Sequence, residues 1–91
     1  MRVKVSYLSI LRDATGVKEE ELQLAEGATV EDLIQALVEK YGERIKKLLT
    51  DSVIEDGIMI TLDGALLSRA EMKKEIHEGS EVLIGLPPFG G

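Results

Sequence analysis

ATVEDLIQALVEKYG, residues 28–42, is the stretch that decides the fold. Thr29 is a residue type that caps free N–H groups at a helix start, and Asp32, three residues later, completes a capping-box pattern. Gly42 is suited to end the helix. Between them, apolar side chains recur at helical spacing in one continuous stripe: Val30, Leu33, Ile34, Leu37, Val38 and Tyr41. The spacing predicts one long helix whose apolar face must pack against a second layer.

Alternating apolar and polar residues before this helix predict two strands of one sheet. Residues 3–7 and residues 20–24 alternate with the period of two that half-buried strands show. Residues 12–16, RDATG, have turn chemistry, and Gly16 can adopt a positive φ. We therefore expect a hairpin at the start of the chain.

The second half of the chain predicts two or three further strands. Residues 58–62 alternate into Asp63-Gly64, a strong hairpin signal, and residues 65–67 return as a weak strand. A last strand is expected over residues 82–86. The predicted class is α+β, with a mixed four- to five-stranded sheet packed on one long helix.

Composition argues against several classes of function. The 91 residues fit one domain, and the formal net charge of −6 would repel nucleic acids and anionic membranes, so a partner with a basic docking surface is favoured. The absence of cysteine excludes disulfides, thiolate catalysis and thiolate metal sites. No leader is visible and no apolar run approaches ~18 residues, so a cytoplasmic protein is expected.

The sequence does not favour catalysis by this chain alone. The single histidine, His77, has no nucleophilic partner nearby in sequence, and we interpret it as a solvated surface residue. The acidic residues 19–21 alternate between the two faces of a predicted strand, and we interpret them as a solvated strand edge. No GxGxxG or P-loop motif is present to hold a nucleotide. No metal site is predicted.

Apolar side chains also fall on the sheet face that the helix does not cover. If the helix covers one face of the sheet, then Leu8, Met59 and Leu83 lie on the other. Single exposed apolar residues are normal, whereas several together on central strands form a patch for a partner. Both interpretations stay open on sequence alone.

In the stretch LIGLPPFGG, residues 83–91, the strand-forming residues 83–86 are followed by two prolines, a phenylalanine and two glycines. Pro87 and Pro88 lack an N–H, cannot continue a strand ladder and favour an extended path. We therefore expect a domain over residues 1–86 and a flexible tail over residues 87–91.

The last three residues are suited to entering a narrow channel. Gly90 and Gly91 have no side chain, which leaves the α-carboxylate of Gly91 unhindered for attack on a nucleotide phosphate. Phe89 is expected to enter an apolar pocket and set the depth of insertion. A frayed terminus that ends in glycines by chance is the alternative interpretation.

Four motifs, in this order, resemble one known family. The motifs are YLSILRDATG, LAEGATVEDLIQAL, LDGALL and EGSEVLIGLPPFGG. The chain resembles the ubiquitin-like sulfur carriers of the ThiS and MoaD type over nearly its whole length, and most of all the MoaD type, the small subunit of molybdopterin synthase. The resemblance implies a ubiquitin-like β-grasp fold.

The resemblance also implies an activity that needs partners. An ATP-dependent adenylating enzyme of the MoeB or ThiF type would activate the Gly91 carboxylate, and a sulfur donor would convert it to a thiocarboxylate. A large subunit of the MoaE type would then receive the tail and pass the sulfur to the precursor of molybdopterin. No cofactor would be bound stably, because ATP is used by the activating enzyme and the sulfur is carried covalently. The chain is thus expected to be the small subunit of a sulfurtransferase complex, with these partner-binding residues: Pro87, Pro88, Phe89, Gly90, Leu8, Met59 and Leu83.

Three other functions stay open. The same activated tail would serve a protein modifier that forms isopeptide bonds with lysines, or a carrier for tRNA thiolation or thiamine thiazole synthesis. An interaction module without any terminal chemistry is the third possibility.

Overall fold

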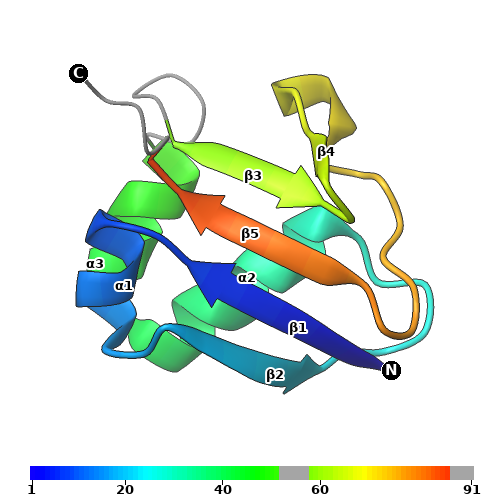
Figure 1. The fold of residues 1–91 in the computed structure, drawn as a ribbon, viewed down its shortest axis with the longest axis horizontal. Helices are drawn as coiled ribbons and strands as arrows, with labels where there is room; N and C mark the ends of the chain where they lie inside the picture. The colour runs from blue at the N-terminus through cyan, green and yellow to red at the C-terminus, as the bar shows by residue number, and fades with distance from the viewer. Residues whose placement is uncertain (52–57, 87–91) are drawn as a thin grey trace.

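The computed structural model describes residues 1–51 and 58–86, and within them it shows a five-stranded mixed sheet (Figure 1). The strand order is β2-β1-β5-β3-β4. The strands are β1 (Arg2–Tyr7), β2 (Glu19–Gln23), β3 (Met59–Leu62), β4 (Ala65–Leu66) and β5 (Glu81–Gly85). The helical elements are α1 (Ile10–Thr15), α2 (Val30–Tyr41), α3 (Glu43–Lys46), the π-helical turn η1 (Lys47–Asp51) and the 3-10 turn η2 (Arg69–Glu71). The predicted α+β class and the weak fourth strand are confirmed.

Helix α2 lies across one face of the sheet and begins where its cap predicts (Figure 1). The Asp32 N–H donates to Thr29 Oγ1 at 3.3 Å, and the Thr29 N–H donates to Asp32 Oδ2 at 2.9 Å. This capping box satisfies two N–H groups that the helix itself cannot. Gly42 follows the last helical residue with a φ of 86°. The apolar stripe of α2 therefore packs on the inner sheet face, whose buried side chains are Val3, Val5, Tyr7, Ile60, Leu62, Val82 and Ile84.

A short helix replaces most of the predicted turn at residues 12–16. Helix α1 ends at Gly16, whose left-handed φ of 79° fits the sequence prediction and whose N–H donates to the Arg12 carbonyl. Leu11 is fully buried and anchors this helix to the core. Six residues are too few to show a helical period in the sequence, so tertiary packing decided the conformation here.

The sheet is held together at its centre by the first and last strands. Strand β5 pairs in parallel with β1 and antiparallel with β3. The predicted hairpin at Asp63-Gly64 is confirmed, with φ angles of 49° and 88°. The Asp63 carboxylate accepts a 2.8 Å hydrogen bond from the Glu81 N–H and a 3.1 Å bond from Ser80 Oγ. This turn is thus tied to the first residue of β5.

Candidate functional site

The structure brings Leu8, Met59 and Leu83 together on the sheet face opposite α2. Met59 pairs with Gly85 in the sheet, and the Leu8 N–H donates to the Ile84 carbonyl at 2.9 Å, so Leu8 and Met59 lie on either side of Gly85. Leu83 precedes them on the same outward-facing side of β5 because strand residues alternate. All three side chains are half-buried. We call these three residues the outer patch.

Gly85 lets the chain at Leu8 lie directly against β5. A Cβ atom placed on Gly85 would lie 2.5 Å from the Leu8 Cβ, 2.7 Å from its carbonyl oxygen and 2.9 Å from its Cα. Backbone atoms cannot give way as the end of a flexible side chain can, so only glycine fits here. The shape of the outer patch therefore depends on this glycine.

We expect Gly85→Ala to destabilise the domain by about 1–3 kcal/mol, because the added methyl group overpacks a backbone contact. Urea denaturation followed by circular dichroism measures the loss. Ser6→Ala, on the same outer face of neighbouring β1, should change stability by less than about 0.5 kcal/mol. A Gly85→Ala protein as stable as the Ser6→Ala control would contradict the close approach.

The outer patch adjoins the point where the described chain stops. Leu86 follows Gly85 and packs partly against the core. The remaining predicted site residues, Pro87, Pro88, Phe89, Gly90 and Gly91, lie outside the described residues. Within residues 1–51 and 58–86, no helix is long and apolar enough to cross a membrane. Among the side chains that the structure describes, in residues 1–49 and 58–86, no group of three or more His, Asp or Glu could hold a metal ion.

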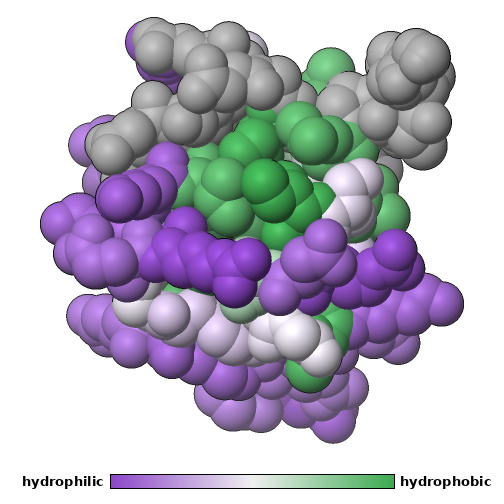
Figure 2. Space-filling model, turned by 90° about the vertical axis from the view of Figure 1, so that its left-hand side faces the viewer, coloured by the Kyte–Doolittle hydropathy of each residue, from purple (hydrophilic) through white to green (hydrophobic). Residues whose placement is uncertain are grey.

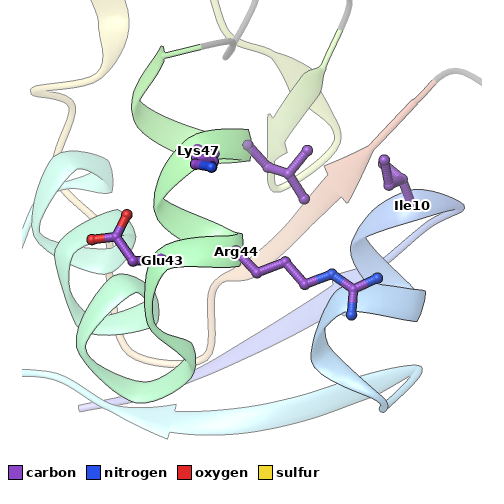
Figure 3. Close-up of a pocket in the computed structure, with 5 residues that line it drawn as sticks. Ile10, Glu43, Arg44 and Lys47 are labelled. Atoms are coloured by element: carbon purple, nitrogen blue, oxygen red, sulfur yellow. The ribbon is translucent and has the colours of Figure 1, made fainter.

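A groove of about 450 Å³ opens between α1 and α3, at the end of the molecule where β5 finishes. Its lining residues are Ile10, Glu43, Arg44, Lys47 and Leu48. Figure 3 shows Arg44 extending from α3 toward α1, and Glu43 on the side of α3 that is turned away from Ile10. Figure 2 views this end of the molecule and shows an apolar surface bordered by hydrophilic residues. We call the groove lined by these five residues the α1–α3 groove.

A half-buried carboxylate, Glu20, joins the sheet to the end of α2. Its Oε2 accepts hydrogen bonds from Tyr7 at 2.6 Å and from Tyr41 at 2.5 Å. Its Oε1 accepts a hydrogen bond from the Lys40 ammonium group. The side chain is 13% exposed. The prediction of a solvated strand edge at residues 19–21 is therefore wrong for Glu20, although the alternation of faces within this run is correct.

The hydrogen bonds set the protonation state of this cluster. Burial alone would raise the pKa of Glu20, but the bonds from Lys40, Tyr41 and Tyr7 favour the ionised form and hold its pKa below the ordinary 4.5. Burial and the Glu20 charge raise the pKa of both tyrosines, so their hydroxyls remain donors. The cluster is therefore ionised at Glu20 and protonated at both tyrosines at neutral pH.

We expect Glu20→Gln to lower the stability at pH 7 by about 1–2 kcal/mol, because a neutral amide accepts these bonds more weakly. The pKa of Glu20 in the folded protein lies below 4.5, its value in the unfolded chain. Its contribution to the free energy of unfolding is therefore complete above pH 4.5 and is lost as the pH falls through the pKa of the folded state. The difference between the wild type and Glu20→Gln, from urea titrations at several pH values, should therefore shrink on acidification. Glu21→Gln, on the exposed face, should give almost no difference; a pH-independent difference for Glu20→Gln would contradict the cluster's role.

Comparison with known sequences places the chain in a family, because residues 5–91 match the profile of the ThiS family. The chain belongs to the ThiS family. The match covers every residue of the outer patch and of the α1–α3 groove. The ThiS-family chain is therefore a ubiquitin-like sulfur carrier with a β-grasp fold, as the four sequence motifs indicated.

Named relatives agree with this assignment. The molybdopterin synthase sulfur carrier subunit of Chlamydomonas reinhardtii is 29% identical over 91 residues, which are 100% of this chain and 99% of that protein. The putative molybdopterin converting factor, subunit 1, of Pyrococcus furiosus has a TM-score of 0.75 at 30% identity and covers 96% of this chain and 98% of its own. Small archaeal modifier protein 1 of Methanosarcina acetivorans has a TM-score of 0.76 at 25% identity and covers 99% of this chain and 96% of its own.

Two features of this ThiS-family member were missed in the sequence. The α1–α3 groove is formed in part by α1, but residues 12–16 predicted a turn instead of a helix. The one signal was Ile10, which interrupts the alternation of the first strand. The Glu20 cluster joins side chains from β1, β2 and α2, which are distant in sequence. The sequence did indicate that Glu20 faces inward, because Glu20 lies two residues before the inward-facing Leu22 on the same strand.

Proposed function

We propose that this chain is the small, sulfur-carrying subunit of a molybdopterin synthase. The observation that carries the proposal is its alignment, end to end, with a relative named molybdopterin synthase sulfur carrier subunit. The Pyrococcus furiosus protein named as a putative molybdopterin converting factor, subunit 1, supports it at 30% identity. Both names describe subunits, so a second chain that completes the synthase is part of the proposal.

The proposed chemistry takes place at the carboxylate of Gly91. A carboxylate is a poor acceptor for nucleophiles, so an adenylating enzyme of the MoeB or ThiF type first lets a carboxylate oxygen attack the α-phosphorus of ATP, with pyrophosphate leaving. A donor then delivers sulfur at the oxidation level of sulfide to the acyl carbon, and AMP leaves. The resulting thiocarboxylate transfers its sulfur to the molybdopterin precursor, and water restores the carboxylate. No bound cofactor is needed on this chain.

The outer patch is the proposed contact for both partners. It adjoins Leu86, so a partner that takes up residues 87–91 would meet Leu8, Met59 and Leu83. Apolar side chains on central strands suit such an interface, and the net charge of −6 favours a basic rim on the partner. We place these partners, an adenylating enzyme and a large subunit of the MoaE type, in the cytoplasm, with no role for nucleic acid or membrane.

Leu83→Asp should weaken binding to the large subunit at least tenfold, because a charge would be buried at the centre of the interface. Titration calorimetry with the purified large subunit measures the loss. Leu66→Asp is the matched control, because Leu66 is 65% exposed on edge strand β4 and lies outside the outer patch. Equal binding by both variants, with both folded, would exclude the outer patch as the contact.

The mass of the intact protein tests the proposed function. Protein purified from its native host should contain a fraction heavier by the difference between one sulfur and one oxygen atom, located at Gly91. Mixed with a large subunit and the precursor, that fraction should yield molybdopterin and return to the unmodified mass. Sulfur that reaches only tRNA or a thiazole would overturn the molybdopterin assignment and leave the carrier chemistry in place.

A protein modifier is the second candidate. The observation in its favour is the likeness to a chain named small archaeal modifier protein 1 at 25% identity. Attack of a lysine amine on the same acyl adenylate would release AMP and form an isopeptide bond. Peptide mass spectrometry of host lysates would then find Gly-Gly remnants on lysines that vanish when this chain is deleted. Their absence would exclude this candidate.

A further inference from the structure

We propose that Met59 is a reversible oxidation site that switches the outer patch between an apolar and a polar state. A hydroperoxide would transfer one oxygen atom to the Met59 thioether, and the resulting sulfoxide would weaken the contact with the partners. The effect on binding rests on the proposed function, whereas the oxidation itself depends on this chain alone.

Methionine is the only residue type in this chain with sulfur in its side chain. The sequence contains three methionines, Met1, Met59 and Met72, and no cysteine. A cysteine would be the usual first target of a hydroperoxide, because its thiolate is the stronger nucleophile. Since the chain has none, we expect its methionine thioethers to be the side chains that a hydroperoxide oxidises first.

The structure separates Met59 from the other two methionines. Met72 is 9% exposed and belongs to the hydrophobic core. Met59 is half-buried on the outer face of β3, which runs beside β5 (Figure 1). Met1 is also half-buried, but it lies at the opposite end of β1 from Leu8, where its amino group donates to the Leu24 carbonyl at 2.7 Å. Because oxidation of methionine follows exposure, Met59 is the reactive methionine of the outer patch.

Oxidation of Met59 would change the chemistry of the outer patch. The other two members of the patch, Leu8 and Leu83, are aliphatic. A methionine among them adapts its shape to different surfaces, which suits a patch proposed to contact two partners. The sulfoxide is polar and chiral, and its oxygen would be buried against apolar groups at a cost in free energy. The modified patch would therefore bind its partners more weakly.

The proposed reaction is a two-electron oxidation of sulfur. The Met59 thioether attacks the terminal oxygen of the hydroperoxide, and the O–O bond breaks. The second oxygen takes up the proton of the first and leaves as water or an alcohol, so the peroxide is reduced. Methionine sulfoxide reductases, one for each sulfoxide epimer, restore the thioether with two electrons from a thiol reductant. The modification is thus reversible, as a switch requires.

Peptide mass spectrometry after treatment of the full-length protein with hydrogen peroxide tests the site. Met59 should gain one oxygen atom at least about ten times faster than Met72, because the core protects Met72. Urea denaturation of the treated protein should give a cooperative transition close to that of the untreated protein, because Met59 lies outside the buried core. Equal rates at Met59 and Met72 in the folded protein would overturn the proposed site.

Binding to the purified large subunit tests the switch. Peroxide treatment of the wild type should raise the dissociation constant at least about tenfold, and the two reductases should restore it. Met59→Leu retains Met1 and Met72, so its affinity should be the same before and after treatment. Met72→Leu conserves volume in the core and should keep the peroxide sensitivity of the wild type.

Two binding results would overturn the switch. The first is a wild-type affinity that stays unchanged although Met59 is fully oxidised. The second is an equal loss of affinity in the treated Met59→Leu protein, which would place the effect at another residue. Absence of binding before any treatment would contradict the proposed function and the switch with it, while the oxidation rates would still establish or exclude the site. Failure of the site alone, with binding intact, leaves the proposed function in place.

Discussion

In the proposed molybdopterin synthase, deleting Gly91 should reduce sulfur transfer by more than about 100-fold while leaving the domain folded. The deletion moves the reacting carboxylate back by up to ~3.6 Å, and misplacement by about 1 Å already costs a reaction on the order of 100-fold. Addition of one residue after Gly91 should have the same effect, because the carboxylate is then carried too far. Formation of molybdopterin in a reconstituted synthase measures the loss.

The fold provides the control for this prediction. The buried apolar core of the described domain runs from Val3 to Ile84, so the urea midpoint of both variants should match that of the wild type. Gly91→Ala keeps the carboxylate at its position and adds one methyl group, so it should retain more activity than the deletion. Activity that survives both the deletion and the extension would exclude the carrier and the modifier, and would leave an interaction module without terminal chemistry.

Leu37→Asp should unfold the domain at 25 °C. Leu37 is 1% exposed in the stripe of α2 that packs on the sheet. Truncation of such a leucine to alanine costs about 2–5 kcal/mol, and an unpaired carboxylate adds the cost of burying a charge. The total stability of a small domain is about 5–15 kcal/mol, so little or none would remain. Far-ultraviolet circular dichroism should show loss of the cooperative transition.

Two variants test whether burial is the cause. Gln35→Asp introduces the same carboxylate on the exposed side of α2 and should leave the domain folded. Leu37→Met conserves volume and should cost less than about 1.5 kcal/mol. A folded, cooperative Leu37→Asp protein would show that α2 is not the anchor of the core.

The parts of the fold that could be predicted depend on contacts between near neighbours in sequence. The cap of α2 needs only Thr29 and Asp32, and the hairpin turn needs only Asp63 and Gly64. Each can therefore be predicted from a few neighbouring residues. The grouping of the outer patch followed from strand alternation around Leu83. Local chemistry and the observed structure agree at each of these points.

The features that escaped prediction depend on contacts between residues far apart in the chain. Helix α1 exists because Leu11 reaches the core, and its six residues carry no helical period. Glu20 meets hydroxyl groups 13 and 21 residues away in sequence, from β1 and from α2. The parity that Glu20 shares with Leu22 indicates an inward side chain, but it does not reveal which hydroxyl groups that side chain meets. The acidic run as a whole resembles a solvated edge.

The position of β5 has a consequence for how the protein is made. The last strand in the described chain lies at the centre of the sheet and joins the β1–β2 hairpin to the β3–β4 hairpin. Until β5 leaves the ribosome, the two hairpins share no strand that links them, and the core stays open. Residues 87–91 are synthesised after every strand of the described sheet, so an activating enzyme of the proposed kind that recognises the outer patch would meet Gly91 only on a completed domain. Unfinished or unfolded copies would go uncharged, which spares the cell both ATP and sulfur.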